Sequence, residues 1–105
     1  MLDSDSCGST ACVVVVRREN GNHVLYTAHV GDSRAVLDQS GQAVRLTPDH
    51  NCFNVDECIR IKQTGGWISM NRVAGVLAVT RAIGDYCVRD AGLISVPQVS
   101  KRILK

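Results

Sequence analysis

The sequence predicts an α+β domain made mostly of antiparallel strands, and three patterns among its 105 residues lead to that class. Residues 12–16 form an unbroken, mostly β-branched apolar run, which is typical of a strand covered on both faces. Residues 24–30 alternate with a period of two after the turn pair Asn20-Gly21, so these two stretches predict a hairpin. Residues 55–64 instead have the spacing of a helix.

Short strands are also expected at residues 35–37 and 43–46, on either side of the turn pair Ser40-Gly41. Together with the hairpin they predict four strands in one antiparallel meander. The rest of the chain reads as smaller pieces: apolar segments at 67–68 and 76–79, a helical turn at 80–83, and an extended segment around 94–99.

The predicted helix has recognisable ends. Asn54 is expected to be its N-cap, with Glu57 three residues later as the reciprocal acid of a capping box. Gly65-Gly66 is the predicted stop. The residues that recur at helical spacing, and so predict the packed face, are Val55, Cys58, Ile59 and Lys62.

Composition narrows the classes of function. A net charge of +2 is too small to predict nucleic-acid binding. No apolar run approaches the roughly 20 residues that span a bilayer, and the N-terminus is acidic, so we expect no membrane association and a cytoplasmic or nuclear location. The five cysteines lack zinc-ligand spacing and predict reduced thiols.

Five short motifs follow one another along the chain. They are Gly-Ser-Thr-Ala at 8–11, Val-Gly-Asp-Ser-Arg at 30–34, Leu-Thr-Pro-Asp-His at 46–50, Glu57 with Arg60-Ile61 and Gly65-Gly66, and the stretch 72–85. In this order they resemble the central segment of the metal-dependent PP2C-type (PPM) protein serine/threonine phosphatases. The resemblance covers nearly all of this chain but well under half of a complete family domain.

The resemblance implies a PP2C-like antiparallel β-sandwich flanked by helices, present here as an incomplete, partial domain over residues 1–105. Residues 1–7 would be its N-terminal tail, and residues 48–72 a flap-like segment that contains the helix at about 55–64. In a complete domain, Mg²⁺ or Mn²⁺ would activate a water that attacks phosphoserine or phosphothreonine in protein substrates.

The resemblance also implies roles for individual residues. Asp32 transfers as a metal-associated carboxylate, and Arg72 as a flap residue near the substrate. No catalytic residue transfers, because the family motifs that hold the other carboxylates and the proposed general acid are expected before Gly8 and after Lys105. The residues expected to be structural are Gly31, Ser33, Arg34 and Asp85.

Several residues have a simpler alternative reading. Asp32 could be a turn residue that bonds to its own backbone, and Arg72 could form a surface salt bridge. His50 is expected to be packed or hydrogen-bonded rather than catalytic. Asp3 and Asp5 mimic a metal-binding pattern, but on a chain terminus they are expected to be solvated.

A cysteine-nucleophile phosphatase is also considered, since Cys12 and Arg18 have the required C-x5-R spacing. That chemistry needs a loop whose amides converge on phosphate, whereas four consecutive valines predict an extended strand. The sequence therefore excludes this class.

Two hypotheses about function remain. The first is a fragment of an active PP2C-type phosphatase that is inactive by itself. The alternative is a truncated pseudophosphatase that acts as a binding or regulatory module. In either case, the valine-rich strand is expected to lack a cover within this chain and to favour self-association.

Overall fold

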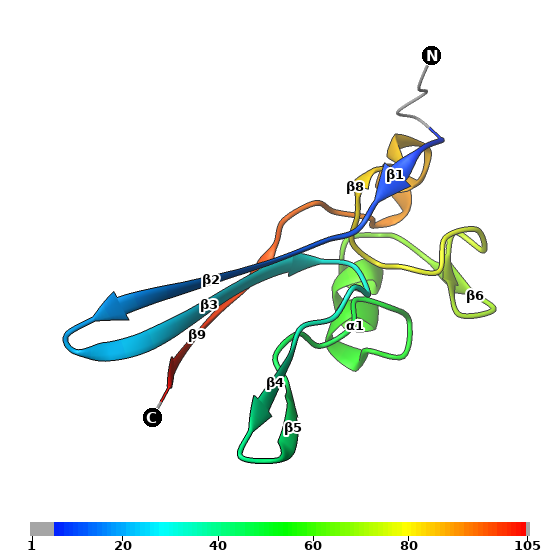
Figure 1. Cartoon of the computed structure of the whole chain (residues 1–105). Coiled ribbons are helices and arrows are strands. Elements are labelled where there is room, and N and C mark those ends of the chain that lie inside the picture. Colours follow the sequence, from blue (N-terminus) through cyan, green and yellow to red (C-terminus); the bar gives the residue numbers. More distant parts are fainter. Residues whose placement is uncertain (1–5, 105) are drawn as a thin grey trace.

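The structure is a computed structural model that describes residues 6–104. Its principal axes measure 46 × 33 × 23 Å and its radius of gyration is 15.8 Å. A compact domain of this length would have a radius of gyration of about 13 Å, so the chain is extended. Figure 1 shows why: one long sheet projects away from the part that contains the helix.

The long sheet consists of β2 (Ala11–Glu19), β3 (Asn22–Val30) and β9 (Gln98–Leu104), all antiparallel, with β3 in the centre. The predicted hairpin is confirmed, because β2 and β3 pair along their whole length. Asn20 and Gly21 both have positive φ values, of 51° and 80°, as a two-residue turn between twisted strands requires.

The predicted four-strand meander is wrong. β4 (Val36–Gln39) and β5 (Gln42–Arg45) form a hairpin of their own, and β9 instead of β4 pairs with β3. The chain turns away from the sheet at Gly31. Its φ of +103° is readily adopted by glycine and is incompatible with a continuing β-strand. The free edge of β3 is then paired by a segment about 70 residues later in the chain.

The valine run of β2 lacks a full cover among the described residues, as the sequence predicts. Val13, Val14, Val15 and Val16 are 55%, 46%, 46% and 58% exposed, and they alternate between the two faces of the strand. β2 is one of the two edge strands of its sheet. Among the described residues, β3 is the one helix or strand with which β2 makes extensive contacts. Cys12 and Arg18 both lie in this extended strand and not in a phosphate-binding loop, which agrees with the exclusion of a cysteine-nucleophile phosphatase.

The helix α1 (Val55–Gln63) starts where the sequence predicts. Oδ1 of Asn54 accepts hydrogen bonds from the amides of Asp56 and Glu57, and Gly65 with a φ of +84° follows the last turn. The reciprocal half of the capping box is absent. The Asn54 amide donates to the carbonyl of Asn51, and Glu57 points into the protein.

The predicted packed face of α1 is correct only for Cys58, which packs against the core, and it is wrong for Val55 and Ile59. Val55 is 69% and Ile59 48% exposed, whereas Glu57 and Ile61 are buried. Ile61 packs with Cys52 and Val73 in one small core cluster. A second cluster contains Ala82, Val88 and Leu93, and Leu77 packs against both.

The remaining elements are short. The predicted helical turn at 80–83 is wrong, because that stretch runs into β8 and the helical turn, a 3₁₀ helix, lies later in the chain. The predicted extended segment around 94–99 overlaps the start of β9, which continues to Leu104. The bounds of the short elements are β1 (Gly8–Ser9), β6 (Ile68–Ser69), β7 (Arg72–Val73), β8 (Ile83–Gly84) and η1 (Tyr86–Ala91).

Candidate functional site

Asp32 lies in the turn that follows β3, and its side chain is exposed. The preceding Gly31 is buried, and a β-carbon there would lie 2.2 Å from Cγ2 of Thr10, so only glycine fits. On the other side of Asp32, the hydroxyl of Ser33 lies 2.6 Å from that of Thr10. The turn is therefore held against the start of β2 by residues on both sides of Asp32.

Arg34 connects the same turn to the segment before α1. Its Nε and Nη2 atoms donate to the two carboxylate oxygens of Asp49, at 3.0 and 2.7 Å. The guanidinium of Arg34 holds the pKa of Asp49 below its ordinary value, chiefly by hydrogen bonding. This ion pair joins the turn after β3 to the segment that precedes α1.

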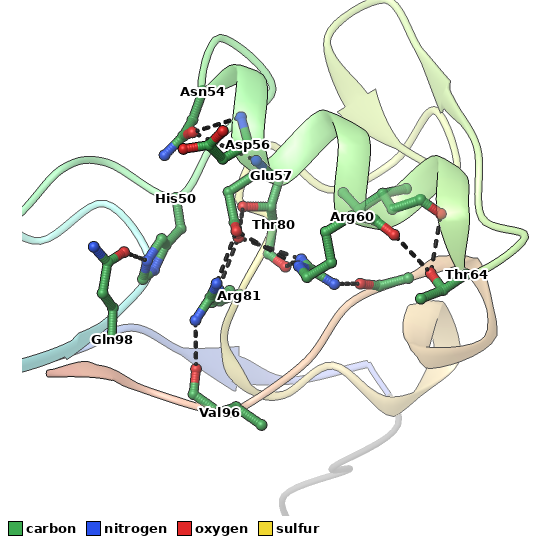
Figure 2. Close-up of polar contacts among 12 residues, drawn as sticks. His50, Asn54, Asp56, Glu57, Arg60, Thr64, Thr80, Arg81, Val96 and Gln98 are labelled. Atoms are coloured by element: carbon green, nitrogen blue, oxygen red, sulfur yellow. Dashed lines mark hydrogen bonds and ion pairs between the residues drawn. The ribbon is translucent and has the colours of Figure 1, made fainter.

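His50 is fully buried beside Gly31. Its Nδ1 accepts a hydrogen bond from the Gly31 amide at 2.9 Å, and its Nε2 lies 3.0 Å from Oε1 of Gln98 on β9 (Figure 2). The imidazole stacks on that of His29, with ring centroids 4.2 Å apart. Burial lowers the pKa of His50, so the ring is neutral near pH 7. The prediction of a packed, hydrogen-bonded histidine is confirmed.

Glu57 is the centre of a buried ionic network (Figure 2). Its carboxylate accepts hydrogen bonds from Nε and Nη2 of Arg81, both at 2.8 Å, and from the hydroxyl of Thr80 at 2.9 Å. Arg60, one helical turn later, approaches to 3.3 Å. Burial alone would raise the pKa of Glu57, but donation by Arg81, Arg60 and Thr80 outweighs it and lowers the pKa to about 2.

The two arginines of this network also donate to backbone carbonyls. Arg60 bonds to the carbonyl of Gly92 at 2.7 Å and to that of Thr80 at 3.0 Å, and Arg81 bonds to the carbonyl of Val96 at 3.0 Å. Helix α1 is thereby joined to the segments on both sides of η1. The network has the features of a structural ion cluster rather than of a reactive group, because each guanidinium nitrogen and the Thr80 hydroxyl already has an acceptor.

Asp85 stands at the start of η1, whereas the sequence placed it after a short helix. Its φ is +50°, and its amide donates to the carbonyl of Cys7 at 2.8 Å. The Asp85 side chain occupies the space beside Gly8, where a β-carbon would lie 2.0 Å from Oδ2. These contacts connect η1 to β1, which pairs with β8.

Arg72 lies on β7, in the hairpin that β7 forms with β6. It is exposed, and its Nη1 donates to the carbonyl of Val76 at 2.9 Å. Its recorded partner is a backbone carbonyl, so no surface salt bridge to Arg72 is seen among the described residues.

The described residues do not fit a two-cation centre by themselves. Between residues 6 and 104 there is no group of three or more His, Cys, Asp or Glu side chains that could hold a metal ion. Hard divalent cations need several oxygen ligands each, and Asp32 supplies a single carboxylate. Asp3 and Asp5 lie outside the described residues.

Several residues that organise this region were not assigned a role from the sequence. They are His29, Thr80, Arg81 and Gln98, together with Glu57 in its buried position. One signal for Glu57 is present in the sequence: it lies four residues before Ile61 and so shares a helix face with it.

None of the helices in the described part of the chain is long and apolar enough to cross a bilayer. The cysteines within it are all free thiols. Burial raises the pKa of Cys52, which makes it a packing residue with little thiolate character.

Comparison with known proteins defines the class. Residues 1–105 match the Protein phosphatase 2C family. The chain is 46% identical over 89 residues to Protein phosphatase 2C homolog 1 of Schizosaccharomyces pombe, which covers 83% of the chain and 26% of that protein. It is 45% identical over 91 residues to Protein phosphatase 2C homolog 1 of Saccharomyces cerevisiae, covering 74% of the chain and 32% of that protein.

A solved structure shares the fold. The "Structure of a C.elegans sex determining protein" superposes with a TM-score of 0.73 at 24% identity, over 90% of this chain and 24% of that one. The likeness concerns the fold alone. From its family match over its full length, the chain belongs to the protein phosphatase 2C family, and it spans about a quarter to a third of the two yeast relatives.

Proposed function

We propose that this chain is a scaffold segment of a metal-dependent PP2C-type protein serine/threonine phosphatase, and that it is inactive by itself. One observation carries the proposal: the whole chain matches the family, yet its described residues contain no group of ligands for a metal ion. A phosphate ester is anionic, and phosphatases of this type use Mg²⁺ or Mn²⁺ to neutralise it and to activate water. A single exposed carboxylate, Asp32, cannot supply that chemistry alone.

The substrates of the complete enzyme would be phosphoserine and phosphothreonine in proteins. Within this segment, Asp32 would contribute to an outer metal position, and Arg72 would lie on the flap beside the substrate. Gly31, Ser33, Arg34 and Asp85 support the turn and the start of η1 through the contacts described above. The predicted cytoplasmic or nuclear location remains part of this proposal.

The test compares the chain alone with the chain in a complete domain. For the latter, the aligned segment of the S. pombe relative is replaced by this sequence, which gives a chimera. With Mn²⁺, p-nitrophenyl phosphate and a phosphothreonine peptide, we expect turnover by the chimera and none by the purified chain. Turnover by the chain alone that Asp32→Ala abolishes would overturn the proposed inactivity, and a folded but inactive chimera would overturn the scaffold role.

A second candidate is a binding module without catalysis. One observation favours it: the flap-like segment exposes large apolar side chains, with Phe53 76%, Trp67 55% and Met70 90% exposed. A binding role predicts that a fluorescent phosphothreonine peptide gains anisotropy with the purified chain and that Trp67→Ala reduces the gain. Val36→Ala on β4 is the matched control, because Val36 is 58% exposed and lies outside the flap. An equal reduction in both variants would contradict binding through the flap.

A further inference from the structure

Gly31 is held at both of its backbone polar groups by one residue. Its amide donates to Nδ1 of His50 at 2.9 Å, and its carbonyl accepts from the amide of His50 at 3.0 Å. A glycine with a φ of +103° has more conformational freedom than any other residue, so its orientation depends on its partners. Here the side chain and the backbone of His50 together determine the direction in which the chain leaves β3.

His50 is itself fixed from several directions. Its carbonyl accepts from the amide of Thr80 at 2.9 Å, its ring stacks on His29, and its Nε2 meets Oε1 of Gln98 at 3.0 Å. An amide N–H can only donate, so Nδ1 must be unprotonated and the proton of the neutral ring must be on Nε2. Nε2–H then donates to Gln98, and a single tautomer satisfies both contacts.

We propose that His50 is a positioning residue, which holds the Gly31 peptide and thereby presents Asp32 at a fixed place at the end of β3. The functional consequence rests on the role proposed above for Asp32. The other side of Gly31 is closed by Thr10, and the Arg81 carbonyl lies 3.3 Å from the place of a β-carbon. The imidazole acceptor fixes the orientation of the Gly31 amide against these neighbours.

A matched pair of variants separates the two bonds of the ring. In His50→Asn, Oδ1 stands near the place of Nδ1 and can still accept from Gly31, but the contact with Gln98 is lost. In His50→Gln, the longer amide reaches toward Gln98 and leaves the buried Gly31 amide without an acceptor. Gln98→Ala removes the Gln98 contact and leaves the ring in place.

The experiment uses the chimera at a temperature at which each variant is folded. We expect His50→Gln to lower kcat by about tenfold or more, since small displacements in an active site have effects of that size. His50→Asn and Gln98→Ala should stay within about threefold of the unmodified chimera. Hydrogen exchange of the Gly31 amide should be faster in His50→Gln alone. Equal losses in the Asn and Gln variants, in proportion to lost stability, would overturn the positioning role.

Two NMR measurements add to this test: one does not depend on enzymatic activity, and the other does not depend on any variant being folded. If the unmodified chimera is inactive, the proposed function fails, but a shifted Asp32 amide resonance in His50→Gln and not in His50→Asn still supports positioning. No difference between the two variants overturns it. In the unmodified chimera, ¹⁵N resonances must show Nδ1 unprotonated and Nε2 protonated, and the opposite tautomer would overturn the proposal even if His50→Gln does not fold.

Discussion

The Nε and Nη2 atoms of Arg81 each lie 2.8 Å from a carboxylate oxygen of Glu57, so one buried acid joins two segments 24 residues apart. This bidentate pair attaches helix α1 to the segment around Arg81, where the carbonyl of Thr80 also accepts a hydrogen bond from Nη2 of Arg60. The geometry explains why an acidic residue lies on the buried face of α1 beside Ile61.

Replacing Glu57 should therefore destabilise the complete domain. Glu57→Gln leaves the partly buried guanidinium of Arg81 without its counter-charge, and we expect the free energy of unfolding of the chimera to fall by about 3 kcal/mol. Urea denaturation measures this change. The matched control is Asp56→Asn on the same helix, which is exposed and should cost about 0.5 kcal/mol. Similar losses in both variants would contradict the importance of the buried pair.

The same residue predicts acid sensitivity. The pKa of Glu57 is lowered from 4.5 to about 2 in the folded protein, so the unfolded chain binds a proton first as the pH falls. The stabilisation is fully present above about pH 4.5 and is lost as the pH falls toward 2, by at most about 3 kcal/mol. Urea midpoints measured from pH 6 to pH 2.5 should decline less in Glu57→Gln. Parallel declines would assign the acid sensitivity to other groups.

Asp32 should affect activity more than stability. In the chimera, Asp32→Ala is expected to reduce turnover and to weaken the response to Mn²⁺, while the free energy of unfolding changes by no more than about 0.5 kcal/mol. Asp38→Ala is the matched control, because Asp38 is also an exposed carboxylate and, from β4, accepts a hydrogen bond from the amide of Gly41 in the following turn at 3.0 Å. An unchanged Mn²⁺ dependence in Asp32→Ala would assign Asp32 to the same turn role.

The isolated chain should associate or unfold easily. Burying a valine fully contributes roughly 1.5 to 3 kcal/mol, so the half-exposed valines of β2 forfeit about 3 to 6 kcal/mol of a total stability of about 5 to 15 kcal/mol. Size-exclusion chromatography and a dye for exposed apolar surface measure the consequence. A charge on an edge strand opposes pairing, so Val15→Lys should reduce association and Val36→Lys on β4 should not. A monodisperse, dye-free monomer that unfolds cooperatively would contradict this prediction.

Local patterns predicted local structure well. Asn20-Gly21 forms the expected hairpin turn and Asn54 caps the expected helix, because each depends on a few neighbouring residues. The packed face of α1 was predicted only in part: Cys58 packs against the core, whereas the apolar Ile59 is exposed and Glu57, expected to be a cap residue, is buried. Which side of a nine-residue helix is buried depends on what approaches it, and here that is Arg81 and the cluster around Ile61.

The sequence by itself determined the family, the hairpin, the bounds of the helix and the glycine-dependent turn that carries Asp32, because motifs and turn chemistry are properties of short segments. Only the tertiary structure decided that β9 pairs with β3, that Glu57 neutralises Arg81, and that His50 holds Gly31. These are contacts between residues that are far apart in the chain. Their free energy depends on which surfaces meet after folding, and no local period in the sequence records that choice.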